Sequence, residues 1–227
     1  LAIAGISHVA APVLDLSIEG ADAVIGDRAF GTTPAEVIPL ATAFIDGLTR
    51  SGVTPIVKHI PGMGRVDIDS HQSLPVVKTP VSILEQSDWI PFQVVSGTRW
   101  AMTAHIVIPE WDHQPITTSE RAMSHIRSLF GDRIIVSDCV TMGALTGAIE
   151  ERIQRTLDAG VDLALFSNGS DEERRRAVEA SGEPRVIREE PIELKPLPRS
   201  ALETLLQKLR EVPTPIPTAD PTWDRRN

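Results

Sequence analysis

Short apolar runs alternate with helix-like segments along the first 170 residues of this 227-residue chain. Five runs have the length and composition of buried strands, at 9–15, 54–60, 100–108, 133–138 and 161–167. Helix signals lie between them: a start at Thr32 and Thr33, and Thr117 with Glu120 at the spacing of a capping box before Gly131. Strands that alternate with helices predict parallel βαβ units, and hence an α/β fold.

Polar side chains stand at or near the C-terminal end of four of these runs. They are Asp15, Lys58 with His59, His105, and Asp138. Catalytic groups of a (β/α)₈ barrel collect at this edge of the sheet. A doubly wound sheet also binds ligands at its strand ends, so the pattern alone leaves both folds open.

Composition limits the classes of function. The formal net charge of −9 argues against a basic surface for nucleic acid, and no apolar run reaches the roughly 18–20 residues of a membrane span. Cys139 is the single cysteine, which excludes an internal disulfide and favours a reducing compartment.

The segment "KHIPGMGRVDIDSH", residues 58–71, holds the densest set of reactive side chains. Asp69 stands two residues before His71, so its carboxylate can accept the ring N–H and prepare an acid/base group. The alternative is a solvated loop pair. Asp138 ends an apolar run, where a carboxylate can serve as nucleophile, base or metal ligand, or can cap a helix.

Three further residues are candidates for ligand contacts. Lys58 and His59 at a strand end suit hydrogen bonds to hydroxyl groups, although a structural histidine is the alternative for His59. Arg28 lies between two glycines and could clamp a polar group, or form a salt bridge to a nearby carboxylate. The sequence has neither a helical H-E-x-x-H motif nor a cysteine cluster, so no metal site is expected.

Together the motifs "APVLDL", "VIGDRAFG", "KHIPGMGRVDIDSH", "AMTAHIVIP", "SDCVTMGAL" and "AGVDLALFSNG" resemble, in order and spacing, the bacterial β-N-acetylhexosaminidase branch of glycoside hydrolase family 3. The resemblance implies a (β/α)₈ TIM-barrel fold and removal of terminal β-linked N-acetylglucosamine with retention of configuration. It implies Asp138 as nucleophile, His71 with Asp69 as acid/base pair, and Arg28, Lys58 and His59 as sugar contacts. The partner it implies is an N-acetylglucosamine-containing glycoside or muropeptide in the cytoplasm, with no cofactor, nucleic acid or membrane.

The sequence departs from that family at its N-terminus. Two strand–helix units precede "APVLDL" in the family and have no counterpart here, so we expect a barrel incomplete at the N-terminus. Five strands cannot close an eight-stranded barrel. Another chain or segment would then complete the sheet, or the chain would be an inactive remnant that binds sugar or protein.

Residues 1–180 are predicted to form the barrel portion. Residues 181–227 are predicted to form a charged, proline-rich linker, an amphipathic helix at 201–212 and a loose tail, and the charged character already begins near residue 171.

Overall fold

The computed structural model describes residues 1–183, 200, 203–204 and 207. Five parallel strands form one sheet in the order β1-β2-β3-β4-β5. They are β1 (His8–Val9), β2 (Thr54–Ile60), β3 (Trp100–Thr103), β4 (Ile134–Cys139) and β5 (Leu163–Leu165).

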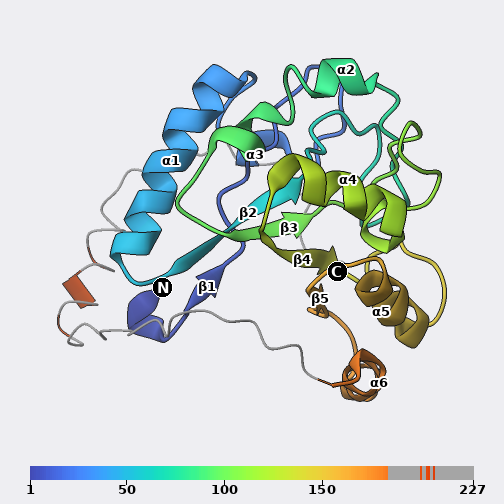
Figure 1. Ribbon diagram of the computed structural model, residues 1–227. Helices are drawn as coiled ribbons and strands as arrows, with labels where there is room; N and C mark the ends of the chain where they lie inside the picture. Colours follow the sequence, from blue (N-terminus) through green and yellow to red (C-terminus); the bar gives the residue numbers. More distant parts are fainter. Residues whose placement is uncertain (184–199, 201–202, 205–206, 208–227) are drawn as a thin grey trace.

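Helices fill the crossovers between the strands. They are α1 (Pro34–Arg50), α2 (Val81–Leu84), α3 (Ile90–Val94), α4 (Glu120–Phe130), α5 (Ile149–Asp158) and α6 (Asp171–Ser181), with 3₁₀ turns η1 (Ala2–Ala4), η2 (Gly26–Arg28) and η3 (Ile116–Thr118). Helices α1, α3 and α4 lie along one side of the curled sheet (Figure 1). The strand order never reverses, as it would in a doubly wound sheet, so the fold is α/β of the TIM-barrel type.

Side chains that alternate between the two faces of the central strands form two apolar layers, one on each face of the sheet. On β2 and β3, Val57 and Ala101 join the large core formed with α1, α3 and α4. Their neighbours Ile56, Trp100 and Met102 join a second cluster. Successive side chains of a strand point to opposite faces, so both faces of this sheet are apolar, as in other parallel sheets.

The start of α1 follows directly from its sequence. Thr33 is the N-cap and accepts a hydrogen bond from the Glu36 N–H, while the Glu36 carboxylate accepts from the Thr33 N–H. Pro34 occupies the first turn, where a missing N–H costs nothing. The predicted helix start at Thr32 and Thr33 is confirmed.

Three predicted strands are longer than the observed ones, and the 161–167 run pairs as a strand only at Leu163–Leu165. The 9–15 run pairs as a strand only at His8–Val9, because Pro12 has no N–H for the ladder, and Val13 then forms a single bridge to Lys58. The 100–108 run ends as a strand at Thr103, after which Val107 pairs with Val76 instead of with β2 or β4.

Two helix predictions need correction. Ser119, not Thr117, caps α4, and its hydroxyl accepts from the Ala122 N–H. The charged segment after residue 171 begins as helix α6, with a capping box between Ser170 and Glu173. It was missed because Ala177 is the one buried residue of α6, too few for an apolar stripe.

The amphipathic helix predicted over 201–212 and the tail lie almost entirely outside the described residues. Among the helices described, none combines the length and the apolar character needed to cross a membrane.

Candidate active site

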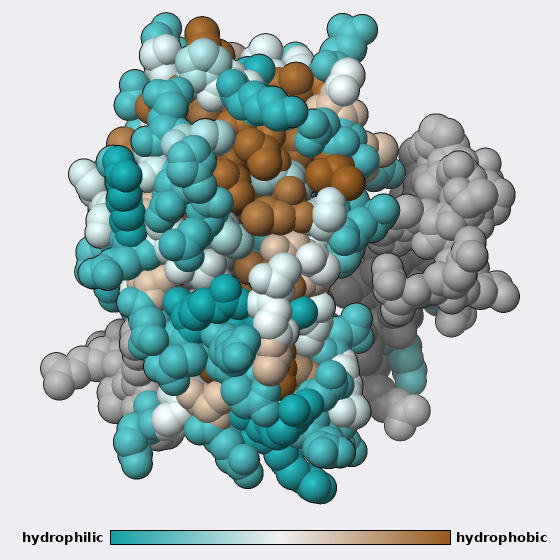
Figure 2. All heavy atoms as spheres, turned by 90° about the vertical axis from the view of Figure 1, so that its right-hand side faces the viewer, coloured by the Kyte–Doolittle hydropathy of each residue, from teal (hydrophilic) through white to brown (hydrophobic). Residues whose placement is uncertain are grey.

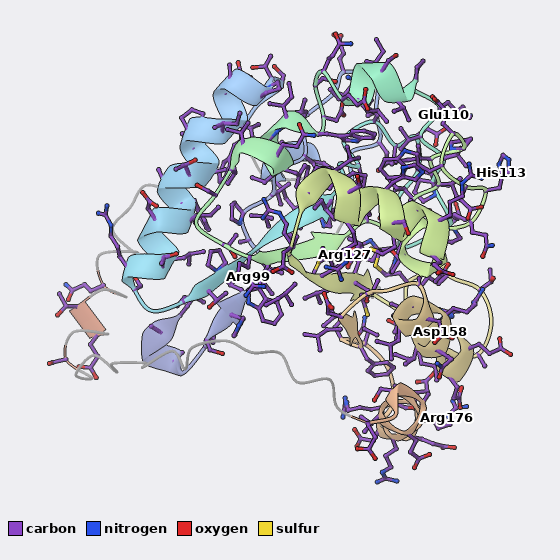
Figure 3. All side chains as sticks on the ribbon, viewed as in Figure 1. Arg99, Glu110, His113, Arg127, Asp158 and Arg176 are labelled. Carbon is purple, nitrogen blue, oxygen red and sulfur yellow. The ribbon has the colours of Figure 1, made fainter. Side chains whose placement is uncertain are left out.

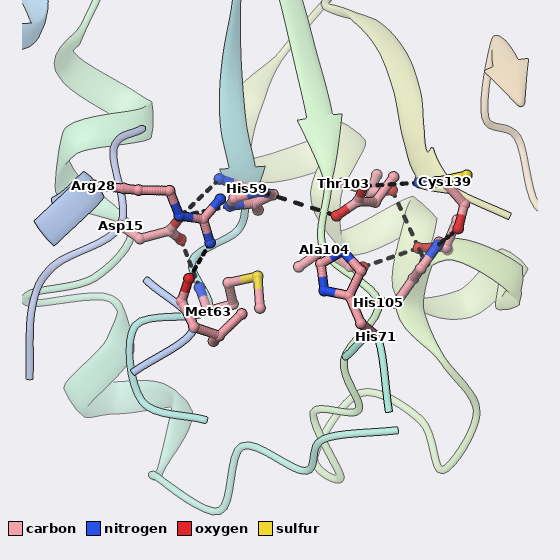
Figure 4. Close-up of polar contacts among 12 residues, drawn as sticks. Asp15, Arg28, His59, Met63, His71, Thr103, Ala104, His105 and Cys139 are labelled. Carbon is pink, nitrogen blue, oxygen red and sulfur yellow. Dashed lines mark hydrogen bonds and ion pairs between the residues drawn. The ribbon is translucent and has the colours of Figure 1, made fainter. Parts of the chain in front are cut away.

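The candidate residues gather where the strands end. β2, β3 and β4 run in the same direction, and Figure 4 shows Asp15, Arg28, His59 and His105 grouped around the tips of β2 and β3. Figure 2 views the molecule from the side toward which these strands point in Figure 1. Apolar side chains gather mainly in the upper half of that face, with hydrophilic ones around them.

A buried carboxylate organises the end of β2. Asp15 is 1% exposed, and its Oδ2 lies 2.7 Å from His59 Nδ1 and accepts from the His59 N–H at 3.1 Å. Its Oδ1 accepts from the Met63 N–H at 2.7 Å. Asp15 therefore holds the His59 ring and the start of the loop after β2 at the same time.

Asp138 lies on the far side of the same histidine. His59 Nε2 is 3.9 Å from Asp138 Oδ2, and the Cys139 N–H donates to Asp138 Oδ1 at 2.7 Å. The Asp138 side chain is 18% exposed, so it remains accessible to a small molecule. α5 begins at Ile149 with Ala148 as its N-cap, which rules out the helix-capping alternative for Asp138.

The cations Lys58 and Arg28 lie close to this pair. Burial, together with the positive charge of Arg28, lowers the pKa of Lys58, while the carboxylates of Asp138 and Asp15 act in the opposite direction. Arg28 is exposed, in η2, and donates to the Val24 carbonyl oxygen. Two cations within electrostatic reach of each other beside a carboxylate can bind the hydroxyl groups of a ligand.

His105 was noted in the sequence only as a polar residue near a strand end. It is fully buried, with Nε2 3.0 Å from the Cys139 carbonyl oxygen and Nδ1 2.9 Å from Thr117 Oγ1. Burial lowers the pKa of His105 and keeps the ring neutral, so Nε2 carries the proton that the carbonyl oxygen accepts. His105 thereby supports the peptide that follows Asp138. The contact joins residues 34 positions apart, which no local sequence signal reveals.

The loop after β2 carries the Asp69–His71 pair. Asp69 Oδ1 lies 2.7 Å from His71 Nδ1, the contact that the Asp-x-His spacing allows, and the His71 side chain is 53% exposed. The loop is attached to the turn after β4: the Gly143 N–H donates to the His71 carbonyl oxygen at 3.1 Å, and the Ala144 N–H to that of Ser70 at 3.0 Å. These bonds connect the segment that carries His71 to the segment that follows Asp138.

Gly143 is required by this close approach of two backbones. A Cβ added there would lie 2.6 Å from the His71 carbonyl oxygen and 2.8 Å from that of Gln72. We expect Gly143→Ala to push the loop off the turn and to lower the free energy of unfolding by about 1–3 kcal/mol. Faster amide hydrogen exchange of residues 69–72 would show the displacement.

Gly47→Ala is the matched control for this change. A Cβ at Gly47, inside α1, would have no atom within 4 Å, so the loop should keep its native exchange rate. Native exchange of residues 69–72 in Gly143→Ala would contradict the predicted docking.

Asp15→Asn should destabilise the end of β2. An amide has one accepting oxygen, so its NH₂ group would face at least one of the N–H donors that Asp15 now satisfies. We expect the free energy of unfolding in urea to fall by roughly 2–4 kcal/mol. Asp132→Asn is the control, because that side chain is 92% exposed and its pairing with Arg99 is worth little, about 0.5 kcal/mol or less. Equal stability of the two variants would contradict the role of Asp15.

The part of the chain that the structure describes contains no group of three or more His, Cys, Asp and Glu side chains arranged to hold a metal ion. Asp138, for which a metal-ligand role was open, instead lies 3.9 Å from His59, and Asp69 pairs with His71.

A curled parallel sheet with ionisable side chains at its C-terminal edge defines a partial barrel of the type used by many enzymes. Residues 1–189 match the family model for the glycosyl hydrolase family 3 N terminal domain. The chain belongs to glycosyl hydrolase family 3.

Named relatives agree with this assignment. A β-hexosaminidase of Tolumonas auensis is 41% identical over 165 residues, which cover 70% of this chain and 49% of the relative. That of Thiobacillus denitrificans is 38% identical over 170 residues, 72% of this chain and 47% of the relative. The structure of NagZ from Neisseria gonorrhoeae with N-trifluoroacetyl-D-glucosamine superposes with a TM-score of 0.72 at 33% identity, covering 90% of this chain and 61% of NagZ. The chain thus spans about half the length of the curated relatives it matches.

Proposed function

We propose that this chain is the catalytic portion of a retaining glycoside hydrolase that removes terminal β-linked N-acetylglucosamine. The observation that carries the proposal is the docking of the His71 loop on the turn that follows Asp138. This docking connects the segment of Asp138, whose carboxylate is accessible at the strand ends, to the loop that carries the Asp69–His71 pair. The β-hexosaminidase relatives and the N-acetylglucosamine analogue bound to NagZ support this substrate class.

In the proposed mechanism Asp138 attacks the anomeric carbon and forms a glycosyl-enzyme, while His71 protonates the departing oxygen. Water, deprotonated by His71, then releases the sugar with its configuration retained. Most retaining glycosidases use a second carboxylate for this proton transfer. Here Asp69 holds the Nδ1 side of the ring, which leaves the Nε2 side of the exposed imidazole to exchange a proton with the substrate.

The remaining polar residues would bind the sugar. Lys58 interacts electrostatically with both Arg28 and Asp138, and His59 lies 3.9 Å from Asp138, so the three residues offer hydrogen-bond donors to hydroxyl groups near that carboxylate. Asp15, which the sequence placed at a strand end without a role, would fix the orientation of His59. We propose muropeptides in the cytoplasm as natural substrates, and a further segment or chain that pairs with the open edges of the five-stranded sheet.

Release of 4-nitrophenol from 4-nitrophenyl N-acetyl-β-glucosaminide by the purified chain tests the proposal. We expect hydrolysis of this substrate and much slower hydrolysis of the matching glucoside, which lacks the acetamido group. A folded chain that binds N-acetylglucosamine without hydrolysis would overturn the proposal and support a sugar-binding module.

A further inference from the structure

Arg152 on α5 makes an unusual set of contacts with the turn after β4. Its Nη1 donates to the carbonyl oxygens of Val140 at 3.0 Å and Met142 at 3.2 Å, and its Nε donates to that of Gly147 at 3.0 Å. The side chain is half-buried, and all three bonds end on main-chain oxygens of one turn. A guanidinium group can link three carbonyls because its donors lie in a fixed plane, whereas a lysine ammonium is a flexible point charge.

The same turn carries the two amides that hold the loop of His71. Gly143 and Ala144 lie between the carbonyls that Arg152 binds, and their N–H groups donate to His71 and Ser70. The contacts therefore run from α5 through Arg152 to the turn, and from the turn to the loop. Packing of Val140 and Leu145 with Ile149 and Ile153 attaches the turn to the same helix.

We infer that Arg152 is a positioning residue, which shapes the 140–147 turn so that the loop with His71 docks beside Asp138. Its effect on catalysis rests on the proposed function, whereas its effect on docking does not. Arg152 would have no contact with substrate. Its loss should impair the proton transfers of His71 more than the attack by Asp138.

Hydrogen exchange of the full 227-residue chain tests the docking directly. In Arg152→Lys, which keeps the charge but not the planar set of donors, we expect the Gly143 and Ala144 amides to exchange at least about tenfold faster. Gly143→Ala disrupts the same docking by placing a Cβ of the turn against the loop, and it should accelerate the Ala144 amide as well. Since both act on one chain of contacts, the double variant should exchange little faster at Ala144 than the faster single variant.

Arg127→Lys is the matched control. Arg127 is also half-buried and also binds carbonyl oxygens, those of Arg133 and Gly160, together with the Asp162 carboxylate. It lies on the preceding helix, and its partners directly precede β4 and β5, at the N-terminal ends of these strands. Arg127→Lys should lower the free energy of unfolding, but it should not specifically accelerate hydrogen exchange of the Gly143 and Ala144 amides.

Kinetics then test the link to His71. In Arg152→Lys, kcat for a disaccharide of N-acetylglucosamine should fall at least about fivefold more than kcat for the 4-nitrophenyl substrate, because a sugar leaving group needs protonation. KM should change little.

Unchanged exchange at Gly143 and Ala144 in Arg152→Lys would overturn the inference, as would equal acceleration in Arg127→Lys. Should the wild-type chain hydrolyse neither substrate, the proposed function fails and the exchange comparison alone decides the docking role. If Arg152→Lys fails to fold, Gly143→Ala is measured instead, with Arg152 intact. A native exchange rate of the Ala144 amide in that variant would contradict the docking of the loop on the turn.

Discussion

Asp138→Asn should reduce hydrolysis of 4-nitrophenyl N-acetyl-β-glucosaminide by roughly 10⁴-fold or more, because the amide cannot form the glycosyl-enzyme. Asparagine has almost the same volume as aspartate, and Asp138 is a partly exposed side chain with one local N–H donor. The free energy of unfolding should therefore change by about 1 kcal/mol or less. Initial rates and urea unfolding of the two proteins measure both quantities.

Asp158→Asn provides the matched control for this experiment. Asp158 ends α5 at the surface of the molecule, where it accepts a hydrogen bond from the Gln154 side chain (Figure 3). Its replacement should leave the rate unchanged. A wild-type rate in Asp138→Asn would remove Asp138 from the mechanism.

His71→Ala should show a loss that depends on the leaving group. A sugar alkoxide leaves slowly without protonation, so hydrolysis of a disaccharide should fall by about 10²–10⁴-fold, the usual contribution of general acid catalysis. A 2,4-dinitrophenyl glycoside needs little protonation, and its glycosylation step should be nearly unaffected. Added azide, a nucleophile that needs no base, should accelerate the second step and yield the β-glycosyl azide.

His125→Ala is a suitable control, because His125 lies on α4 and stacks on Trp111 with ring centroids 5.1 Å apart. It should lose no rate on either substrate. An equal loss on both leaving groups in His71→Ala, with no effect of azide, would exclude an acid/base role.

Local signals were enough to predict much of the fold. The alternation of strand-like and helix-like segments predicted the parallel sheet, and the Thr33–Glu36 cap begins α1 near the predicted position. The start of α4 was predicted wrongly for a long-range reason. Thr117 is buried and its hydroxyl contacts His105 near the end of β3, so it does not cap the helix. α6 was missed because it buries only Ala177.

The candidate site was predictable to the extent that its residues end strands. Asp138, Lys58 and His59 lie where the strand pattern placed them. The residues that hold them in place were not predictable. Asp15 bonds to a residue 44 positions away, and Arg152 acts through the shape of a turn, so neither role leaves a local pattern.

Trapping of the glycosyl-enzyme tests whether Asp138 is the nucleophile. The His71→Ala protein is mixed with 2,4-dinitrophenyl N-acetyl-β-glucosaminide, acid-quenched and digested with pepsin, and the modified peptide is sequenced by mass spectrometry. Because this variant lacks the base for the second step, we expect one N-acetylglucosaminyl group to accumulate on the peptide that contains Asp138, at the Asp138 carboxylate. An adduct at another residue, or turnover without any adduct and with inversion of the sugar's configuration, would exclude Asp138 as the nucleophile.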